Sequence, residues 1–126
     1  MEILVPLLSI IYTYEYMLID NFYHIIERAE DKVTIQFNAS HPIYAAHFPG
    51  SPITPGACLV KIAEELIGKQ ITRISNLKFS KTVLPSNKVT FSFEAKHPNK
   101  YRITISDLDN IYAQFIATYL CPDSNI

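Results

Sequence analysis

The chain has 126 residues, of which 48% are apolar and 18% are charged, and its formal net charge at pH 7 is −1. This composition indicates one folded domain with a hydrophobic core and argues against an intrinsically disordered chain. The near-zero charge argues against a nucleic-acid-binding protein. The only cysteines are Cys58 and Cys121, which form no disulfide-rich pattern, so we expect a reducing compartment and a cytoplasmic location.

The first 16 residues are apolar and contain no Lys or Arg. They lack the basic region and the small-residue cleavage site of a secretory signal, and they are too short and interrupted for a membrane span. Two interpretations stay open: the segment adds a strand or helix that packs on the domain or on a partner, or Met17 is the native start. We therefore expect an N-terminal extension over residues 1–16 and a single domain over residues 17–126.

Most of the remaining chain alternates apolar and polar residues, which predicts half-buried β-strands. A short helical turn is expected over residues 18–22. The pattern predicts a sheet of five or six strands. The segments that read as strands cover residues 23–29, 32–38, 70–79, 89–95, 101–106 and 111–120. Turns are expected at residues 30–31, 84–87, 97–100 and 107–110. The last strand is apolar enough for a central position in the sheet.

The stretch over residues 47–68 differs from the rest, because it contains all three glycines and three of the eight prolines. Proline fixes φ and cannot join a sheet ladder, so we expect a rigid, extended loop that opens at residues 40–42. After Gly56, apolar residues recur at helical spacing up to Ile67, and Gly68 is the expected C-terminal cap. One long helix with five or six antiparallel strands predicts an α+β fold in which the sheet wraps around the helix.

Residues 47–56 read HFPGSPITPG and lead directly into this apolar helix. The motif resembles the β-hydroxyacyl-ACP dehydratases of the hot-dog fold, which remove water from 3-hydroxyacyl thioesters in fatty-acid synthesis. A weaker similarity to the same family lies in residues 74–87, at KFSK (78–81) and VLPSN (83–87). The resemblance implies a hot-dog fold whose sheets pair in dimers, with a site shared across the dimer interface.

The resemblance also implies roles for residues of the loop. His47 would be the acid/base group, and the Gly56 N–H, at the positive end of the helix, would stabilise charge on the thioester oxygen. Five further residues would contact the substrate: Tyr44, Phe48, Pro55, Ala57 and Cys58. For two of these a structural role is the alternative, since Tyr44 would also suit packing on the loop and Cys58 would also suit a buried, inert thiol.

The implied partner is an acyl carrier protein or CoA thioester, and the implied assembly is a homodimer or larger hot-dog oligomer, with a heterodimer as the alternative. No cofactor is expected, and the sequence contains no metal-ligand spacing such as C-x-x-C or H-E-x-x-H. Three lysines, Lys78, Lys81 and Lys88, surround one turn. They form either a solvated edge or a docking patch for an acidic carrier protein.

The chain departs from the family at the position of its second catalytic group. The family has Glu or Asp 14 residues after the loop histidine, whereas this chain has Lys61 there. An ammonium group cannot accept a proton unless burial lowers its pKa by several units. Glu64 and Glu65 follow three and four residues later on the helix, within reach of Lys61. Glu65 would either form a structural ion pair or replace the missing acid.

Two classes of function therefore stay open. The first is a dehydratase-like enzyme of fatty-acid or related acyl-chain biosynthesis that retains His47 and the Gly56 amide. The second is a non-catalytic acyl-thioester-binding protein, or the inactive partner of a heterodimeric dehydratase whose other chain supplies the carboxylate. An acyl thioesterase ranks lower, because only Glu64 and Glu65 offer a carboxylate on the helix.

Overall fold

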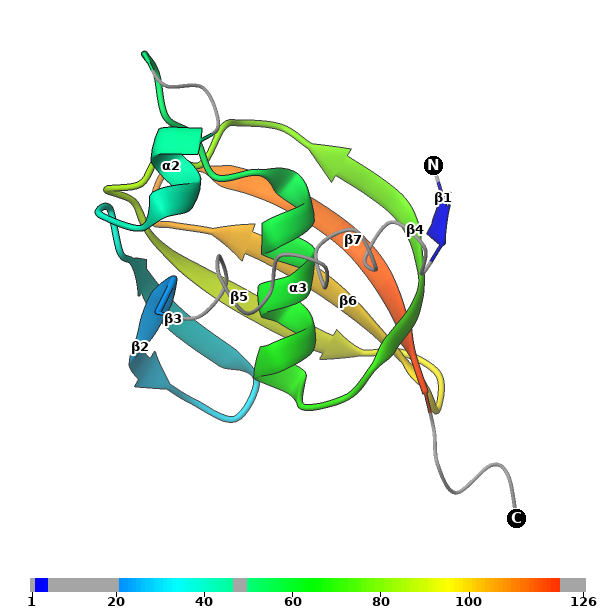
Figure 1. Ribbon diagram of the computed structural model, residues 1–126. Coiled ribbons are helices and arrows are strands. Elements are labelled where there is room, and N and C mark those ends of the chain that lie inside the picture. The colour runs from blue at the N-terminus through cyan, green and yellow to red at the C-terminus, as the bar shows by residue number, and fades with distance from the viewer. Residues whose placement is uncertain (1, 5–20, 47–49, 121–126) are drawn as a thin grey trace.

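The protein, seen in a computed structural model, is described over residues 2–4, 21–46 and 50–120. Within these residues the strands are β1 (Glu2–Leu4), β2 (Tyr23–Arg28), β3 (Lys32–Phe37), β4 (Ile71–Phe79), β5 (Lys88–Ala95), β6 (Lys100–Ser106) and β7 (Ile111–Tyr119), and the helices are α2 (Pro42–Ala46) and α3 (Gly56–Ile67). The described strands form one antiparallel sheet in the order β1-β4-β7-β6-β5-β3-β2, which curves around α3 (Figure 1). The α+β prediction is confirmed, and β1 adds one short strand to the expected sheet.

The hydrophobic core lies between α3 and the inner face of the sheet. On α3 the buried residues include Leu59, Ile62, Ala63 and Leu66, as the helical spacing predicts. On the sheet they include alternate residues of β3, β5, β6 and β7, namely Val33, Ile35, Phe37, Val89, Phe91, Ile103, Ile105, Ala113, Phe115 and Ala117. The 3.6-residue period of the helix and the two-residue period of the strands thus place apolar side chains in the same core. Each fully buried large apolar side chain contributes about 1.5–3 kcal/mol to the stability of the fold.

Helix α3 ends where the sequence predicts. Gly68 adopts the left-handed conformation with φ 68°, and its N–H donates to the Glu64 carbonyl at 3.1 Å. A residue with a Cβ atom is strained in this conformation, whereas glycine is not. Gly68 therefore allows the chain to turn directly from α3 into β4.

Strand β4 carries an irregularity close to its end. Its register against β7 shifts between Ser75 and Lys78, and Asn76 within this interval has a positive φ of 54°. Such a β-bulge bends a strand and redirects the side chains that follow it. The bulge therefore sets the direction of Phe79, the last residue of β4.

Strand β2 forms the edge of the sheet beyond β3. Two large apolar side chains on it are exposed, Ile25 at 42% and Ile26 at 47%. The register against β3 shifts between Ile25 and Glu27, so this edge strand also contains a bulge. Its outward backbone groups consequently do not follow a regular repeat.

Helix α2 corrects the sequence prediction of an extended loop from residue 40 onward, which is wrong for residues 42–46. Pro42 occupies the first helical position, where its missing N–H costs no hydrogen bond. His41 caps the helix, because its Nδ1 accepts a hydrogen bond from the Ile43 N–H at 3.1 Å. A one-turn helix gives too short a periodic signal to be found in the sequence.

The N-terminal segment contributes β1, which pairs with residues 73–75 of β4. This pairing agrees with the interpretation that the segment adds a strand. Residues 5–16 and most of the helical turn expected over residues 18–22 lie outside the described residues, so the division of the chain near residue 17 stays a prediction. In the described part of the chain, every helix is too short or too polar to span a membrane.

Candidate active site at the start of helix α3

Helix α3 begins at Gly56, directly after Pro55, whose backbone is extended with φ −62° and ψ 141°. The Pro55 carbonyl accepts hydrogen bonds from the N–H groups of Cys58 at 3.0 Å and Leu59 at 3.3 Å, which closes the first turn. The first N–H groups of a helix have no acceptor within that helix, and the helix dipole is positive there. The Gly56 amide therefore lies where an oxygen that gains negative charge would be stabilised.

A groove of about 260 Å³ adjoins this helix start. It is lined by residues before and within α3 and by residues at and after the end of β4, namely Ile53, Thr54, Gly56, Leu59, Phe79, Ser80, Lys81, Thr82 and Val83. The Thr54 N–H donates to the Val83 carbonyl at 2.7 Å, so a hydrogen bond joins the two walls. The two stretches that carried the family resemblance in the sequence thus meet in space.

The ring of Phe79 lies against the backbone of Gly56. A Cβ atom at position 56 would lie 2.5 Å from Phe79 Cζ and 2.9 Å from Phe79 Cε1. A Cβ at position 56 would therefore require the ring to move, and glycine leaves room for the ring to lie against the backbone. Phe79 was not among the site residues predicted from the sequence, because no local pattern predicts which residue approaches a glycine from a distant strand.

Tyr44 is buried in the core with 4% of its surface exposed. Its hydroxyl shares a hydrogen bond of 2.8 Å with the Thr54 hydroxyl, and its ring centroid lies 5.6 Å from that of Phe22. Burial raises the pKa of Tyr44 to about 12. These contacts tie α2 to the segment that leads into α3. They support the packing role rather than substrate contact, because in the described part of the chain Tyr44 does not line the groove.

Lys61, at the position of the family carboxylate, lies inside the protein. Its Nζ is 3.0 Å from Glu64 Oε1, and the two side chains are only 6% and 7% exposed. Glu64 Oε2 accepts a hydrogen bond from the Ile71 N–H at 2.8 Å, so this carboxylate also ties α3 to the start of β4. Lys61 is therefore paired with Glu64, which also accepts the hydrogen bond from β4, and not with Glu65 as expected from the sequence.

Glu65 is exposed and lies on a different side of α3. Its Oε1 accepts a hydrogen bond of 2.8 Å from the Tyr23 hydroxyl of β2. Burial and this hydrogen bond raise the pKa of Tyr23. Glu65 follows Gly56 by nine residues, a rise of about 13 Å along the helix, which far exceeds the separation of neighbouring carbons in one substrate. The geometry thus gives no support to Glu65 as a replacement acid.

The structure describes three of the remaining predicted site residues and leaves two outside the described ranges. Cys58 is 1% exposed, and burial raises the pKa of its thiol to about 12, as expected for an inert thiol. Pro55 and Ala57, on either side of Gly56, are half-buried, and their substrate contacts stay predictions. His47 and Phe48 lie outside the described residues, so their roles stay predictions as well.

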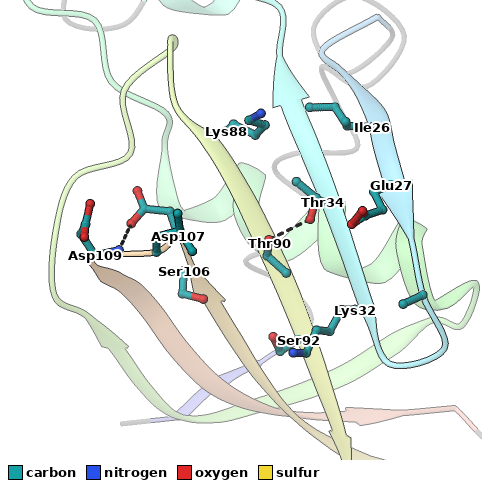
Figure 2. A pocket seen from close by; sticks show the side chains of 12 residues that line it. Ile26, Glu27, Lys32, Thr34, Lys88, Thr90, Ser92, Ser106, Asp107 and Asp109 are labelled. Atoms are coloured by element: carbon teal, nitrogen blue, oxygen red, sulfur yellow. Dashed lines mark hydrogen bonds between the residues drawn. The ribbon is translucent and has the colours of Figure 1, made fainter.

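The three lysines considered as a docking patch do not gather at one groove. Lys81 lines the groove beside α3, and its Nζ donates to Asn110 Oδ1 at 2.7 Å. Lys88 lines a second groove of about 670 Å³ on the outer face of the sheet, where Thr34 and Thr90 share a hydrogen bond of 2.8 Å (Figure 2). The acidic side chains of Asp107 and Asp109 border this outer groove. Of these three lysines, Lys81 therefore borders the candidate site, whereas Lys88 borders the outer groove.

Among the described residues, no group of three His, Cys, Asp or Glu side chains is arranged to hold a metal ion. The described donors of the site are backbone amides, hydroxyls and lysine ammonium groups. This donor set suits an anionic or carbonyl oxygen rather than a cation.

Residues 25–115 match the family model described as ApeI-like: ApeI dehydratase. A curated relative, the 3-hydroxyacyl-[acyl-carrier-protein] dehydratase FabZ of Rhizobium rhizogenes, is 31% identical over 94 residues, which are 62% of this chain and 58% of the relative. The chain thus spans less than two thirds of the length of the curated relative it matches.

Two solved structures share the fold. The dehydratase heterocomplex ApeI:P from Xenorhabdus doucetiae has a TM-score of 0.63 at 19% identity and covers 78% of this chain and 95% of that chain. An uncharacterized protein from Erwinia carotovora subsp. atroseptica has a TM-score of 0.50 at 17% identity and covers 77% of this chain and 89% of that chain. The hot-dog fold expected from the loop motif is confirmed.

Proposed function

Because this chain belongs to the ApeI-like dehydratase family, we propose that it binds 3-hydroxyacyl thioesters of ACP or CoA and acts on them as a dehydratase of acyl-chain biosynthesis. The observation that carries the proposal is the start of α3 at Gly56, at the end of the HFPGSPITPG motif and within the matched region. A cytoplasmic location and a dimeric or larger assembly belong to the same proposal.

Dehydration breaks the C2–H bond and the C3–O bond of the substrate, forms the C2=C3 double bond and releases water. His47, as a neutral imidazole, takes the C2 proton and then donates a proton to the leaving hydroxyl. The Gly56 N–H donates to the thioester oxygen while negative charge develops on it. Lys61 cannot take the part of the family carboxylate, since its ammonium group is engaged with Glu64.

The test compares dehydration of 3-hydroxyacyl-ACP and hydration of the matching enoyl-ACP by the parent chain and by the His47→Ala variant. We expect slow turnover by the parent, because loss of one acid/base group costs about 10²–10⁴-fold. The His47→Ala variant should show no turnover above background. Equal rates for parent and variant would refute the role of His47, and no turnover by the parent would refute the enzyme proposal for the isolated chain.

Restoring the carboxylate requires a double substitution. Lys61→Glu alone would place two carboxylates together inside the protein, so we combine it with Glu64→Gln, whose side chain still accepts from the Ile71 N–H. The matched control is Lys61→Gln with Glu64→Gln, which removes the ion pair without adding an acid. A higher rate in the first double variant than in the control is the expected result.

A second candidate is the non-catalytic partner of a heteromeric dehydratase. It is favoured by the enclosed Lys61–Glu64 pair, which occupies the acid position with a structural interaction. The structurally similar ApeI:P protein is described as a dehydratase heterocomplex. For this candidate we expect no turnover by the chain alone. Turnover should appear only when the chain is mixed with a second hot-dog chain that carries Glu at the corresponding position, and it should again depend on His47.

The thioesterase alternative ranks below both. A thioesterase would need a carboxylate on the helix, and only Glu64 and Glu65 are available. Glu64 is engaged with Lys61 and with the Ile71 N–H, and Glu65 is about 13 Å along the helix from Gly56. Release of free CoA or of the carrier thiol from an acyl thioester, measured beside dehydration, distinguishes the two reactions.

A further inference from the structure

We propose that Phe79 is a movable aromatic lid over the Gly56 amide, and that it controls how readily a thioester carbonyl reaches that amide. This inference rests on the proposed function, because it deepens the account of the same site. Phe79 acts as a positioning residue through the space it occupies and takes no part in proton transfer.

The tip of the Phe79 ring occupies the space directly above Gly56. The three ring atoms nearest to a Cβ at this position would be Cζ at 2.5 Å, Cε1 at 2.9 Å and Cε2 at 3.0 Å. Gly56 and Phe79 line the same groove, so a thioester that enters this groove to accept a hydrogen bond from the Gly56 N–H meets the ring. The ring and a bound thioester therefore compete for space beside Gly56.

The backbone around Phe79 is fixed, whereas its ring is not enclosed. The N–H groups of Ser80 and Lys81 both donate to the Tyr112 carbonyl, at 2.8 and 3.3 Å. The Phe79 side chain is nonetheless 50% exposed, so turning it away from the groove sacrifices little buried apolar surface.

A lid of this kind lowers the apparent affinity for its ligand. Binding requires the open arrangement, and the measured dissociation constant is the intrinsic one divided by the open fraction. A ring that covers Gly56 in about nine molecules of ten weakens binding about tenfold. Removing the ring should therefore lower Kd and KM without changing kcat, because the reacting groups are unaffected.

Phe79→Ala should produce this effect, because it deletes the ring and keeps Gly56. Leu108→Ala is the control, since Leu108 is also an exposed apolar residue and lies outside this groove.

The probe is 3-hydroxybutyryl-N-acetylcysteamine, and its binding is followed by titration calorimetry together with hydrogen exchange of the amides at positions 56 and 57. We expect Phe79→Ala to bind the probe about tenfold more tightly than the parent and to exchange these amides faster. Phe79→Tyr should restore parental binding, and Leu108→Ala should equal the parent. KM measured with the parental substrate should fall with Kd while kcat stays constant.

Unchanged Kd and unchanged exchange in Phe79→Ala would overturn the lid, as would weaker binding in Phe79→Ala or no probe binding in any variant. Failure of the enzyme proposal looks different. In that case the parent and all variants show no His47-dependent turnover, while the shifts in Kd and amide exchange still identify the lid.

Discussion

The ammonium group of Lys61 and the carboxylate of Glu64 form an ion pair of 3.0 Å that is enclosed by the protein, one helical turn apart on α3. Glu64 also accepts a hydrogen bond from the Ile71 N–H, so the pair links the helix to the strand that follows it. A group that a related dehydratase would use for chemistry is replaced here by a group that holds secondary structures together.

Removal of one member of this pair should destabilise the protein strongly. Lys61→Met leaves the Glu64 charge buried without this partner, and we expect a loss of about 3–5 kcal/mol in the free energy of unfolding. The double variant Lys61→Met with Glu64→Gln should lose much less, because neither charge of this pair remains. Urea denaturation of the parent and both variants measures this difference. Equal losses in the single and double variants would contradict the predicted coupling.

A second prediction uses two glycines of unlike conformation. Gly68→Ala places a Cβ in the left-handed region and should cost about 1 kcal/mol of stability. Gly50→Ala is the matched control: a Cβ there meets nothing within 4 Å and φ is not positive, so we expect no loss or a gain of up to about 1 kcal/mol. Thermal unfolding of both variants decides the matter. A larger loss at position 50 than at position 68 would contradict the assignment of the helix cap.

The buried thiol of Cys58 should make stability depend on alkaline pH. Burial raises its pKa from the ordinary value of 9.0 to about 12. Between these values the unfolded chain has lost the proton while the folded chain retains it. The contribution is therefore complete below pH 9 and is lost as pH rises toward 12. Denaturant unfolding at pH 8, 9, 10 and 11 should show a steeper decline for the parent than for Cys58→Ala. Parallel declines would refute the prediction.

The buried hydrogen bond between Tyr44 and Thr54 should contribute measurably to stability. Tyr44→Phe leaves the enclosed Thr54 hydroxyl without this partner, and we expect a loss of about 1–3 kcal/mol. Tyr119→Phe is the control, because the Tyr119 hydroxyl donates to the Pro98 carbonyl in an exposed position and its loss should cost less. If the two variants lose equal stability in urea denaturation, burial does not strengthen the Tyr44 bond.

Local periodicity was sufficient to predict the core and most elements. In β3 and β5 every second residue faces the hydrophobic core, and in α3 the residues at helical spacing face the same core. Each of these patterns is local in the sequence, so it can be recognised without the structure. Gly68 was predictable for a similar reason, since a single residue next to the helix determines its end. The one-turn helix α2 was missed because its five residues depend on capping by His41 rather than on a repeating pattern.

The site was less predictable, because its contacts join residues far apart in the chain. The family resemblance singled out Lys61, and helical spacing gave its possible ion pairs. The choice of Glu64 over Glu65 depends on the Ile71 N–H and on the Tyr23 hydroxyl, which belong to two different strands. The contact between Phe79 and Gly56 joins the end of β4 to the start of α3, and no local sequence signal encodes such a contact.

The bulge in edge strand β2 has a consequence for the behaviour of the protein in concentrated solution. A regular edge strand with the exposed side chains of Ile25 and Ile26 would be a template for another chain to add a strand, the first step toward fibrils. The register shift between Ile25 and Glu27 interrupts the spacing that such an added strand requires. One extra residue in β2 thus protects the molecule from aggregating edge to edge.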